Sequence, residues 1–281
     1  MNWAALEYTR PAGLEQALEL LEEPGSRALG GGAQLIPALR RGGLTCRRVV
    51  DISRLPELNG LQVEGDALWV GAAVTLRDLA AHPAARERLP LLVEAAGMSG
   101  DPAFRNAATL GGQVVWNTPG LPLLAALYAL DPQVILLSRS GERARPLQDF
   151  TLVLGGLVRG LRVPFPVPGE RSVLLRAGRT QNAGPAAATV CAAGRLEAGR
   201  LRGVRLTAGG ETLPVRHLYG VEAAVEGRSL SADTLQATRD AALAALSPVL
   251  RDQLNGEYLI RVLAGLACRA LQALNTRLEA A

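Results

Sequence analysis

The chain contains no lysine, and all 30 of its basic residues are arginine. A lysine ammonium is therefore excluded as a catalytic base, as a Schiff-base former and as a phosphate anchor. Histidine and cysteine are also scarce, with 2 and 3 copies in 281 residues. No two cysteines have the spacing of a metal or iron–sulfur site, so we expect neither a bound metal nor a disulfide framework. No Gly-x-Ser-x-Gly motif is present, and we single out no catalytic residue.

Long apolar runs are missing as well. The run Leu121–Leu130 is too short to span a membrane, and Met1–Arg10 lacks the apolar core of a secretory signal. We therefore expect a cytoplasmic protein without a membrane span. Aromatic residues form only 4% of the chain, against 48% hydrophobic residues, which predicts an aliphatic core. The net charge of +4 is spread along the chain, so nucleic acid is not an expected partner.

The N-terminal region alternates helix-like and strand-like segments. Apolar residues recur every three or four positions before Pro24-Gly25, which predicts a helix that ends there. A strand, a glycine-rich segment, a second helix and a second strand follow, in the order of a βαβ unit. The predicted elements are a helix over Pro11–Glu23, a strand over Arg27–Leu29, a helix over Ala33–Arg41 and a strand over Arg48–Ile52.

The middle region is expected to mix both kinds of element. Alternating apolar residues around a Gly-containing turn indicate two strands, and Thr75 followed by Asp78 predicts a capped helix start. We read Asp101–Gly112 as a polar, proline-broken stretch and Leu161–Arg171 as an extended linker. The regular elements predicted here are strands over Gly60–Val63, Ala67–Ala73 and Gln133–Ser138 and helices over Leu89–Met98 and Leu121–Leu130.

The C-terminal region reads as strands followed by helices. Short alternating runs separated by glycine turns predict an antiparallel sheet, and two apolar-faced helices come after it, so the region is expected to be an α+β domain. The strands are expected over Ser172–Ala177, Ala186–Ala193 and Leu201–Thr207, and the helices over Thr234–Leu246 and Leu254–Leu274.

Two glycine-rich segments carry most of the functional information. The first is Gly30-Gly31-Gly32-Ala33-Gln34-Leu35, and the second is Thr109-Leu110-Gly111-Gly112-Gln113. Glycine lets backbone N–H groups converge on an anion, and each segment follows an apolar run that we read as strand-like. Together they predict a clamp that holds one pyrophosphate group from two sides. The chain is therefore expected to bind a dinucleotide, though not in the usual Rossmann manner.

These segments give the chain its resemblance to a known family. With the lead-in Asp101–Asn106 and the helix Leu254–Ala270, they resemble the FAD-binding (medium) subunits of molybdenum hydroxylases, the group that includes carbon monoxide dehydrogenase and xanthine dehydrogenase. The resemblance implies a vanillyl-alcohol-oxidase-like FAD-binding fold of two subdomains plus a C-terminal α+β domain. The implied domains are 1–55 and 56–165 for FAD binding and 170–281 for the C-terminal flavoprotein domain.

The resemblance also implies which residues contact FAD. Backbone N–H groups of the first segment would face the pyrophosphate, and the second segment would close the other side, with the Thr109 hydroxyl as a further donor. Arg176 would place positive charge near the flavin ring. The residues implied to bind the cofactor are Gly30, Gly31, Gly32, Ala33, Gln34, Leu35, Asn106, Thr109, Gly111, Gly112, Asn117, Thr118 and Arg176.

The function that the resemblance implies is electron transfer. The chain would carry electrons from the clusters of an iron–sulfur subunit, itself fed by a molybdopterin subunit, to NAD, a quinone or oxygen. The sequence departs from the family after Pro119, where Gly120 leads directly into Leu121, and at Asn182, where the family has an aspartate. These departures motivate one alternative, a scaffold or assembly subunit without flavin. A self-contained flavin oxidoreductase is the other.

Overall fold

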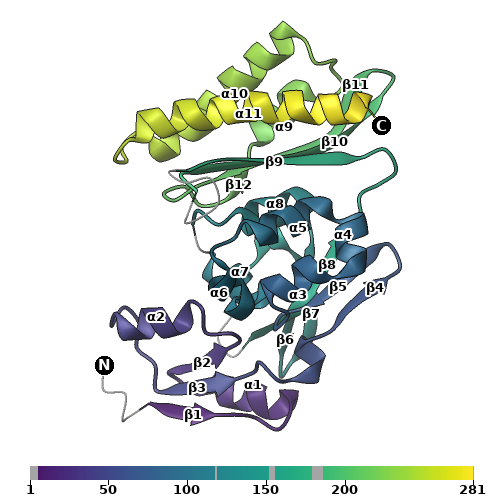
Figure 1. The fold of residues 1–281 in the computed structure, drawn as a ribbon. Helices are drawn as coiled ribbons and strands as arrows, with labels where there is room; N and C mark the ends of the chain where they lie inside the picture. Colours follow the sequence, from purple (N-terminus) through teal and green to yellow (C-terminus); the bar gives the residue numbers. More distant parts are fainter. Residues whose placement is uncertain (1–5, 118, 152–155, 179–185, 281) are drawn as a thin grey trace. The chain divides into compact units, whose positions relative to one another are not determined.

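The structure is a computed structural model that describes residues 6–117, 119–151, 156–178 and 186–280. It divides into two compact units, each built from three segments of the chain (Figure 1). The first unit is formed by Met1–Glu87, Asp101–Asn117 and Asp131–Phe165, and the second by Arg88–Gly100, Thr118–Leu130 and Pro166–Ala281. The domains 1–55, 56–165 and 170–281 stay a prediction. None of the helices described is both long and apolar enough to cross a membrane.

The first unit begins with a three-stranded parallel sheet. Its strands are β1 (Glu7–Thr9), β2 (Ser26–Leu29) and β3 (Arg48–Asp51), in the order β1-β3-β2. Because side chains alternate along β3, Val50 packs with helix α1 (Leu14–Glu22) while Val49 packs with helix α2 (Leu35–Arg40). The predicted βαβ unit is confirmed as β2-α2-β3. Both helices are shorter than predicted, and β1 was not predicted.

A buried carboxylate ties β1 to the end of β3. Asp51 is 5% exposed and accepts hydrogen bonds from the Tyr8 hydroxyl, from Arg10 Nε and Nη2 at 3.2 and 2.9 Å, and from the Ser53 hydroxyl at 2.6 Å. Burial by itself raises the pKa of Asp51, but the hydrogen bonds from Ser53, Tyr8 and Arg10 outweigh it and lower the pKa to about 2. The charged form therefore stabilises the fold.

We expect Asp51→Asn to lower the free energy of unfolding by about 1–2 kcal/mol near neutral pH, because half-exposed Arg10 is partly screened by solvent. The folded-state pKa lies below the unfolded value, so this stabilisation is complete above the unfolded pKa and is lost as the pH falls towards about 2. Urea unfolding at about pH 6 and about pH 3 should show the difference between wild type and variant narrowing by about 1 kcal/mol.

The exposed pair Asp66–Arg162 provides the control for this experiment, with Asp66 largely in solvent. Asp66→Asn should cost less than about 1 kcal/mol at either pH. An equal loss of stability in the two variants would show that the Asp51 hydrogen bonds contribute no more to the unfolding free energy than an exposed ion pair does.

The larger sheet of the first unit has five antiparallel strands. They are β4 (Leu61–Glu64), β5 (Ala67–Gly71), β6 (Gln133–Ser138), β7 (Gly141–Pro146) and β8 (Leu157–Pro164), in the order β4-β5-β8-β6-β7. The linker predicted over Leu161–Arg171 is wrong in its first part, because β8 is the central strand of this sheet. Its only proline is its last residue, Pro164, so the strand interior keeps its backbone donors. The exposed, arginine-containing strand β7 was not predicted.

Short helices connect and cover these strands. They are α3 (Leu76–Ala81), α4 (Pro83–Arg88), α6 (Pro102–Ala107) and α7 (Leu110–Trp116), with 3-10 turns η2 (Pro56–Leu58) and η3 (Leu147–Asp149). The predicted cap is confirmed, since Thr75 Oγ1 accepts from the Asp78 N–H at 3.1 Å. The irregular stretch predicted over Asp101–Gly112 is wrong. Asp101 caps α6 and Pro102 occupies its first turn, where proline favours a helix start.

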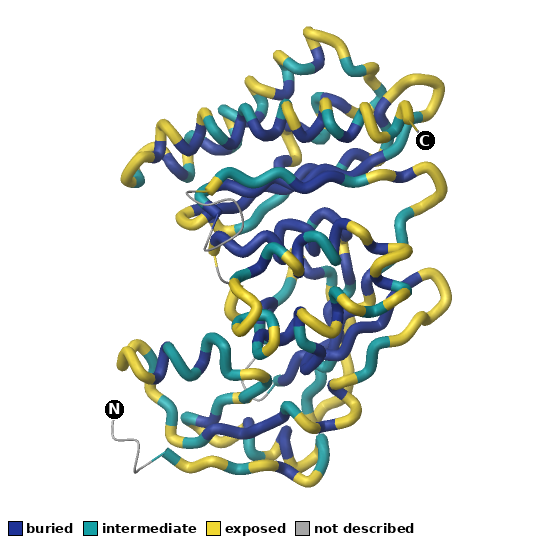
Figure 2. The backbone as a smooth tube through the Cα atoms, viewed as in Figure 1, coloured by how far each residue is buried: buried dark blue, intermediate teal, exposed yellow. Residues whose placement is uncertain are grey.

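The second unit is a four-stranded antiparallel sheet with helices on both faces. Its strands are β9 (Arg171–Ala177), β10 (Ala188–Glu197), β11 (Arg200–Gly209) and β12 (Arg216–His217), in the order β12-β11-β10-β9. Helices α9 (Tyr219–Val225) and α11 (Gly256–Glu279) pack against one face, and α10 (Ala232–Leu250) packs on these two helices. Buried segments, dark blue in Figure 2, alternate with exposed ones along α10 and α11. The predicted order of strands before helices is confirmed, with α9 and β12 as additions.

Two helices from earlier in the chain cover the other face of this sheet. They are α5 (Pro90–Gly97) and α8 (Pro122–Leu130). Polar side chains on β11 form hydrogen bonds to the backbone of α8. Arg205 Nε donates to the Ala129 carbonyl at 2.6 Å, and the buried Thr207 hydroxyl donates to the Ala125 carbonyl at 2.8 Å. Arg205 also pairs with Glu170, which is buried. These bonds attach α8 to a sheet that lies far away in the sequence.

Candidate functional site

The two glycine-rich segments meet within the first unit. A β-carbon placed on Gly30 would lie 2.8 Å from Thr109 Oγ1, and one placed on Gly31 would lie 1.5 Å from the Ala107 carbonyl oxygen. Real β-carbons do not approach other atoms so closely, so only glycine allows this contact. The structure thus brings together two segments that are far apart in the sequence.

The first segment is a loop between β2 and α2. Gly32 has a φ of +73°, a left-handed conformation that glycine adopts without strain. The helix begins at Leu35 and not at Ala33, so Ala33 and Gln34 belong to the loop. Within the part of the chain that the structure describes, no protein acceptor pairs with the backbone N–H groups of residues 31–35. This loop therefore offers several donors to a bound anion.

The second segment is the first turn of helix α7, and it follows helix α6, so the strand-like run predicted before it is wrong. The Gly111 N–H donates to the Ala72 carbonyl at 2.9 Å, and a β-carbon on Gly111 would lie 2.5 Å from that of Ala72. Gly111 thus serves close packing. Thr109 Oγ1 accepts from the Gly112 N–H at 3.3 Å, which leaves its hydroxyl hydrogen able to donate to a ligand.

A cavity of about 460 Å³ opens where the two segments meet. Its walls come from the edge strand β2, from α7 and from the start of β8, and it is lined by Leu21, Ser26, Arg27, Ala28, Gly30, Leu35, Leu44, Ile52, Ala72, Thr109, Gly111, Gly112, Val115, Trp116, Gly156, Leu157 and Val158. No acidic side chain is among these lining residues. The volume lies within the range of about 300–1,000 Å³ that small-molecule sites occupy.

The donors around this cavity fit the pyrophosphate of a flavin dinucleotide. Besides the loop N–H groups and the Thr109 hydroxyl, the Arg27 guanidinium supplies a positive charge. Gln34 precedes Leu35 in the sequence but does not itself line the cavity, and its side-chain Nε2 is buried without a hydrogen-bond partner. A buried donor without an acceptor costs about 1–3 kcal/mol, so a ligand oxygen at this position would remove a penalty.

One buried hydrogen-bond acceptor on α7 also lacks a partner. Gln113 is 1% exposed on α7, and its side-chain carbonyl oxygen has no partner among the described residues. Gln113 follows Gly112, which lines the cavity, but does not line it itself. Neither Gln113 nor Arg27 is among the cofactor residues predicted from the sequence. The signal for Gln113 was a polar side chain directly after the glycine pair, inside an otherwise apolar turn, and for Arg27 it was a cation next to the first loop.

Other predicted cofactor residues lie elsewhere. Asn106 is exposed on α6, and exposed Asn117 ends α7 with a left-handed φ of 43°. Thr118 and Asn182 fall outside the described residues. Arg176 is on β9 in the second unit. Their contacts with a cofactor stay predictions.

Nothing in the described residues suggests metal or thiol chemistry. No group of three or more His, Cys, Asp or Glu side chains could hold a metal ion in that part of the chain. Burial raises the pKa of all three thiols, Cys46, Cys191 and Cys268, and Cys191 is completely buried. The raised pKa keeps these thiols protonated and unreactive near neutral pH.

Comparison with known proteins matches the chain to two family models. Residues 4–164 match the FAD binding domain in molybdopterin dehydrogenase, and residues 177–274 match the CO dehydrogenase flavoprotein C-terminal domain. The carbon monoxide dehydrogenase medium chain of Hydrogenophaga pseudoflava is 28% identical over 95% of this chain and 96% of that protein. The glyceraldehyde dehydrogenase medium chain of Sulfolobus acidocaldarius is 31% identical over 82% of this chain and 84% of that one.

A solved structure is also similar. The carbon monoxide dehydrogenase from Hydrogenophaga pseudoflava that lacks the Mo-pyranopterin moiety superimposes with a TM-score of 0.91 at 27% identity, covering 97% of this chain and 98% of that one.

Proposed function

Because the chain belongs to the family of FAD-binding subunits of molybdenum hydroxylases, we propose that it holds FAD in the cavity between β2 and α7 and transfers electrons within a multi-subunit enzyme. The observation that carries this proposal is the meeting of the two glycine-rich segments at a cavity, beside a loop whose backbone N–H groups have no acceptor among the described residues. The fold predicted from the sequence, a FAD-binding part followed by a C-terminal α+β domain, is confirmed by the structural match.

The predicted cofactor, FAD, and the predicted enzyme class, an oxidoreductase subunit, are confirmed at the level of the family. The family model describes a FAD-binding domain, and the relatives above are oxidoreductase subunits. Electron transfer by this chain, its individual partners and its acceptor are part of the proposal.

In the proposed site, the backbone N–H groups of the first loop hold the pyrophosphate together with the Thr109 hydroxyl. The Arg27 guanidinium neutralises part of the phosphate charge, and hydrogen bonds to charged groups contribute about 1.5–3 kcal/mol each. Asn106, Asn117, Thr118 and Arg176 remain proposed contacts from the family resemblance.

Bound FAD supplies redox chemistry that connects one-electron carriers with two-electron acceptors. The chain itself contributes binding and electrostatics, since the cavity is lined by no acidic side chain and no histidine. We propose that the electrons come from an iron–sulfur subunit, that a molybdopterin subunit oxidises the substrate, and that NAD or a quinone accepts the electrons. The relatives named above are medium chains, which supports such a division among subunits.

The proposed electron transfer is tested by comparing the isolated, FAD-loaded chain with the complex that it forms with an iron–sulfur subunit and a molybdopterin subunit. We expect the substrate of the complex to bleach the visible flavin absorbance only when all subunits are present. Bleaching of the isolated chain by a small substrate at the same rate would contradict this electron transfer and favour a self-contained flavin oxidoreductase.

A further inference from the structure

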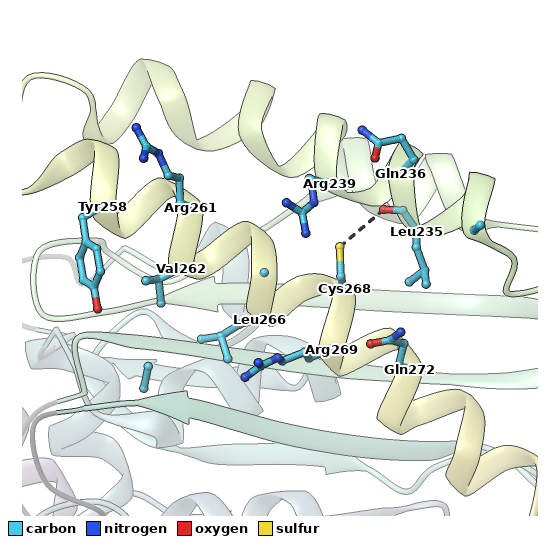
Figure 3. Close-up of a pocket in the computed structure, with 13 residues that line it drawn as sticks. Leu235, Gln236, Arg239, Tyr258, Arg261, Val262, Leu266, Cys268, Arg269 and Gln272 are labelled. Atoms are coloured by element: carbon cyan, nitrogen blue, oxygen red, sulfur yellow. Dashed lines mark hydrogen bonds between the residues drawn. The ribbon is translucent and has the colours of Figure 1, made fainter.

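The second unit contains a cavity of about 750 Å³ that the proposed function does not use. It lies along α10 and α11, beside the end of edge strand β9 (Figure 3). Its lining residues are Ala177, Ala232, Leu235, Gln236, Arg239, Tyr258, Arg261, Val262, Gly265, Leu266, Cys268, Arg269 and Gln272. We call this surface the arginine groove.

The arginine groove carries positive charge from two helices. Arg239 reaches from α10 towards Cys268, while Arg261 and Arg269 come from α11, and all three side chains are exposed (Figure 3). None of the lining residues is acidic. The two lining glutamines and the tyrosine hydroxyl add neutral hydrogen-bonding groups, so the groove can pair with anionic groups and has no anion in its own wall.

Most of this charge is not neutralised by the chain itself. Arg261 pairs with Glu257 one turn earlier at 3.2 Å, but both side chains are more than three-quarters exposed, so the pair is weak. Among the residues that the structure describes, no carboxylate pairs with Arg239 or Arg269. These two guanidinium groups are therefore available to a carboxylate from another chain, for which arginine offers bidentate geometry.

An exposed aromatic side chain lies at one end of the arginine groove. It is Tyr258, in the first turn of α11, which is 66% exposed (Figure 3). Tyrosine and arginine are enriched at the centres of protein interfaces, where a rigid ring and a guanidinium fork bind with little loss of conformational freedom. An exposed aromatic ring beside arginines that lack a carboxylate partner, Arg239 and Arg269, points to a protein partner more than to a free ion.

We propose that the arginine groove binds an acidic, extended segment of a partner subunit. This inference rests on the proposed function, because the proposed multi-subunit enzyme provides the partner. Arg261 and Arg269 are about 12 Å apart along the axis of α11. An extended chain advances about 3.3 Å per residue, so carboxylates three or four residues apart match the two arginines. Arg239 provides a third charge from the facing helix, and Tyr258 packs against an apolar residue of the segment.

The test reverses the charge of the arginine groove in the Arg239→Glu/Arg269→Glu variant and measures binding to the partner subunits. The matched control is Arg143→Glu/Arg145→Glu, which changes two exposed arginines of β7 in the first unit. We expect the groove variant to bind at least about 30-fold more weakly and the control to stay within about threefold. Equal losses in the two variants, or wild-type binding by the groove variant, would overturn the proposal.

A peptide probe distinguishes two negative results: a groove that does not bind acidic segments, and a complex that does not form. It is a fluorescent peptide of about twelve residues with glutamate at every fourth position, compared with its glutamine counterpart. Wild-type protein should bind the glutamate peptide at least about tenfold more tightly, and the groove variant should lose this preference. If wild type binds no subunit but shows the preference, only the partner assignment fails. If it shows no preference, the groove proposal fails.

Thermal unfolding checks that each variant is folded. The neutral variant Arg239→Gln/Arg269→Gln replaces the reversal if that variant unfolds early, and it should weaken binding in the same direction by a smaller factor.

Discussion

Replacing Gly31 by alanine is expected to weaken FAD binding at least about tenfold. The new β-carbon would lie 1.5 Å from the Ala107 carbonyl oxygen, which is a backbone atom and cannot rotate away. The loop must then move away from α6, which separates Gly30 from Thr109 and opens the cavity where the pyrophosphate is proposed to bind. We expect the affinity for FAD to fall at least about tenfold, which corresponds to about 1.4 kcal/mol.

The measurement is the FAD content of purified protein and a titration of added FAD into the FAD-free chain. Gly13→Ala is the matched control, because a β-carbon there meets no atom within 4 Å and its φ of −164° suits any residue. The control should keep wild-type FAD content. If Gly31→Ala also keeps it, the contact between the two glycine-rich segments is not needed for FAD binding.

The second large effect is expected in the second unit, from Arg205→Ala. Arg205 pairs with the buried carboxylate of Glu170 and donates to the last turn of α8 through Ala129. Removing the guanidinium leaves a buried charge without a partner, which costs about 3 kcal/mol in comparable cases. It also leaves a carbonyl at the end of α8 without its donor. We therefore expect a loss of about 3 kcal/mol in unfolding free energy.

Denaturant unfolding measures this loss, with Arg195→Ala as the control. Arg195 pairs with Glu197 on the surface, where an ion pair contributes less than about 1 kcal/mol. Adding Glu170→Gln to Arg205→Ala should recover part of the stability, because the variant then no longer buries a charge. A loss as small as that of the control would show that Arg205 does not hold α8 in place.

Local sequence patterns predicted the parts of the fold that local forces decide. The βαβ unit around α2, the strand Gln133–Ser138 and the cap at Thr75 were predicted from periodicity and capping residues alone. Two of the wrong predictions involved proline. Pro102 and Pro164 were taken as breaks, but one begins a helix and the other ends the central strand, positions where a missing N–H has no cost.

The contacts that build the candidate site could not be predicted in the same way. The family pattern indicated that both glycine-rich segments face one ligand, but the approach of Gly31 to Ala107 depends on tertiary packing. The same holds for α8, whose all-apolar sequence predicted a buried helix without indicating that β11 would fasten it. Gln113 was overlooked because the lack of a donor for its side-chain carbonyl oxygen exists only in the folded chain.

The most direct test of the account is a visible absorption spectrum of the purified chain, followed by release and identification of any flavin. We expect the flavin bands, with FAD close to one per chain after incubation with the cofactor. A colourless protein that takes up no added FAD would contradict it, and a scaffold subunit without flavin would then describe the chain better.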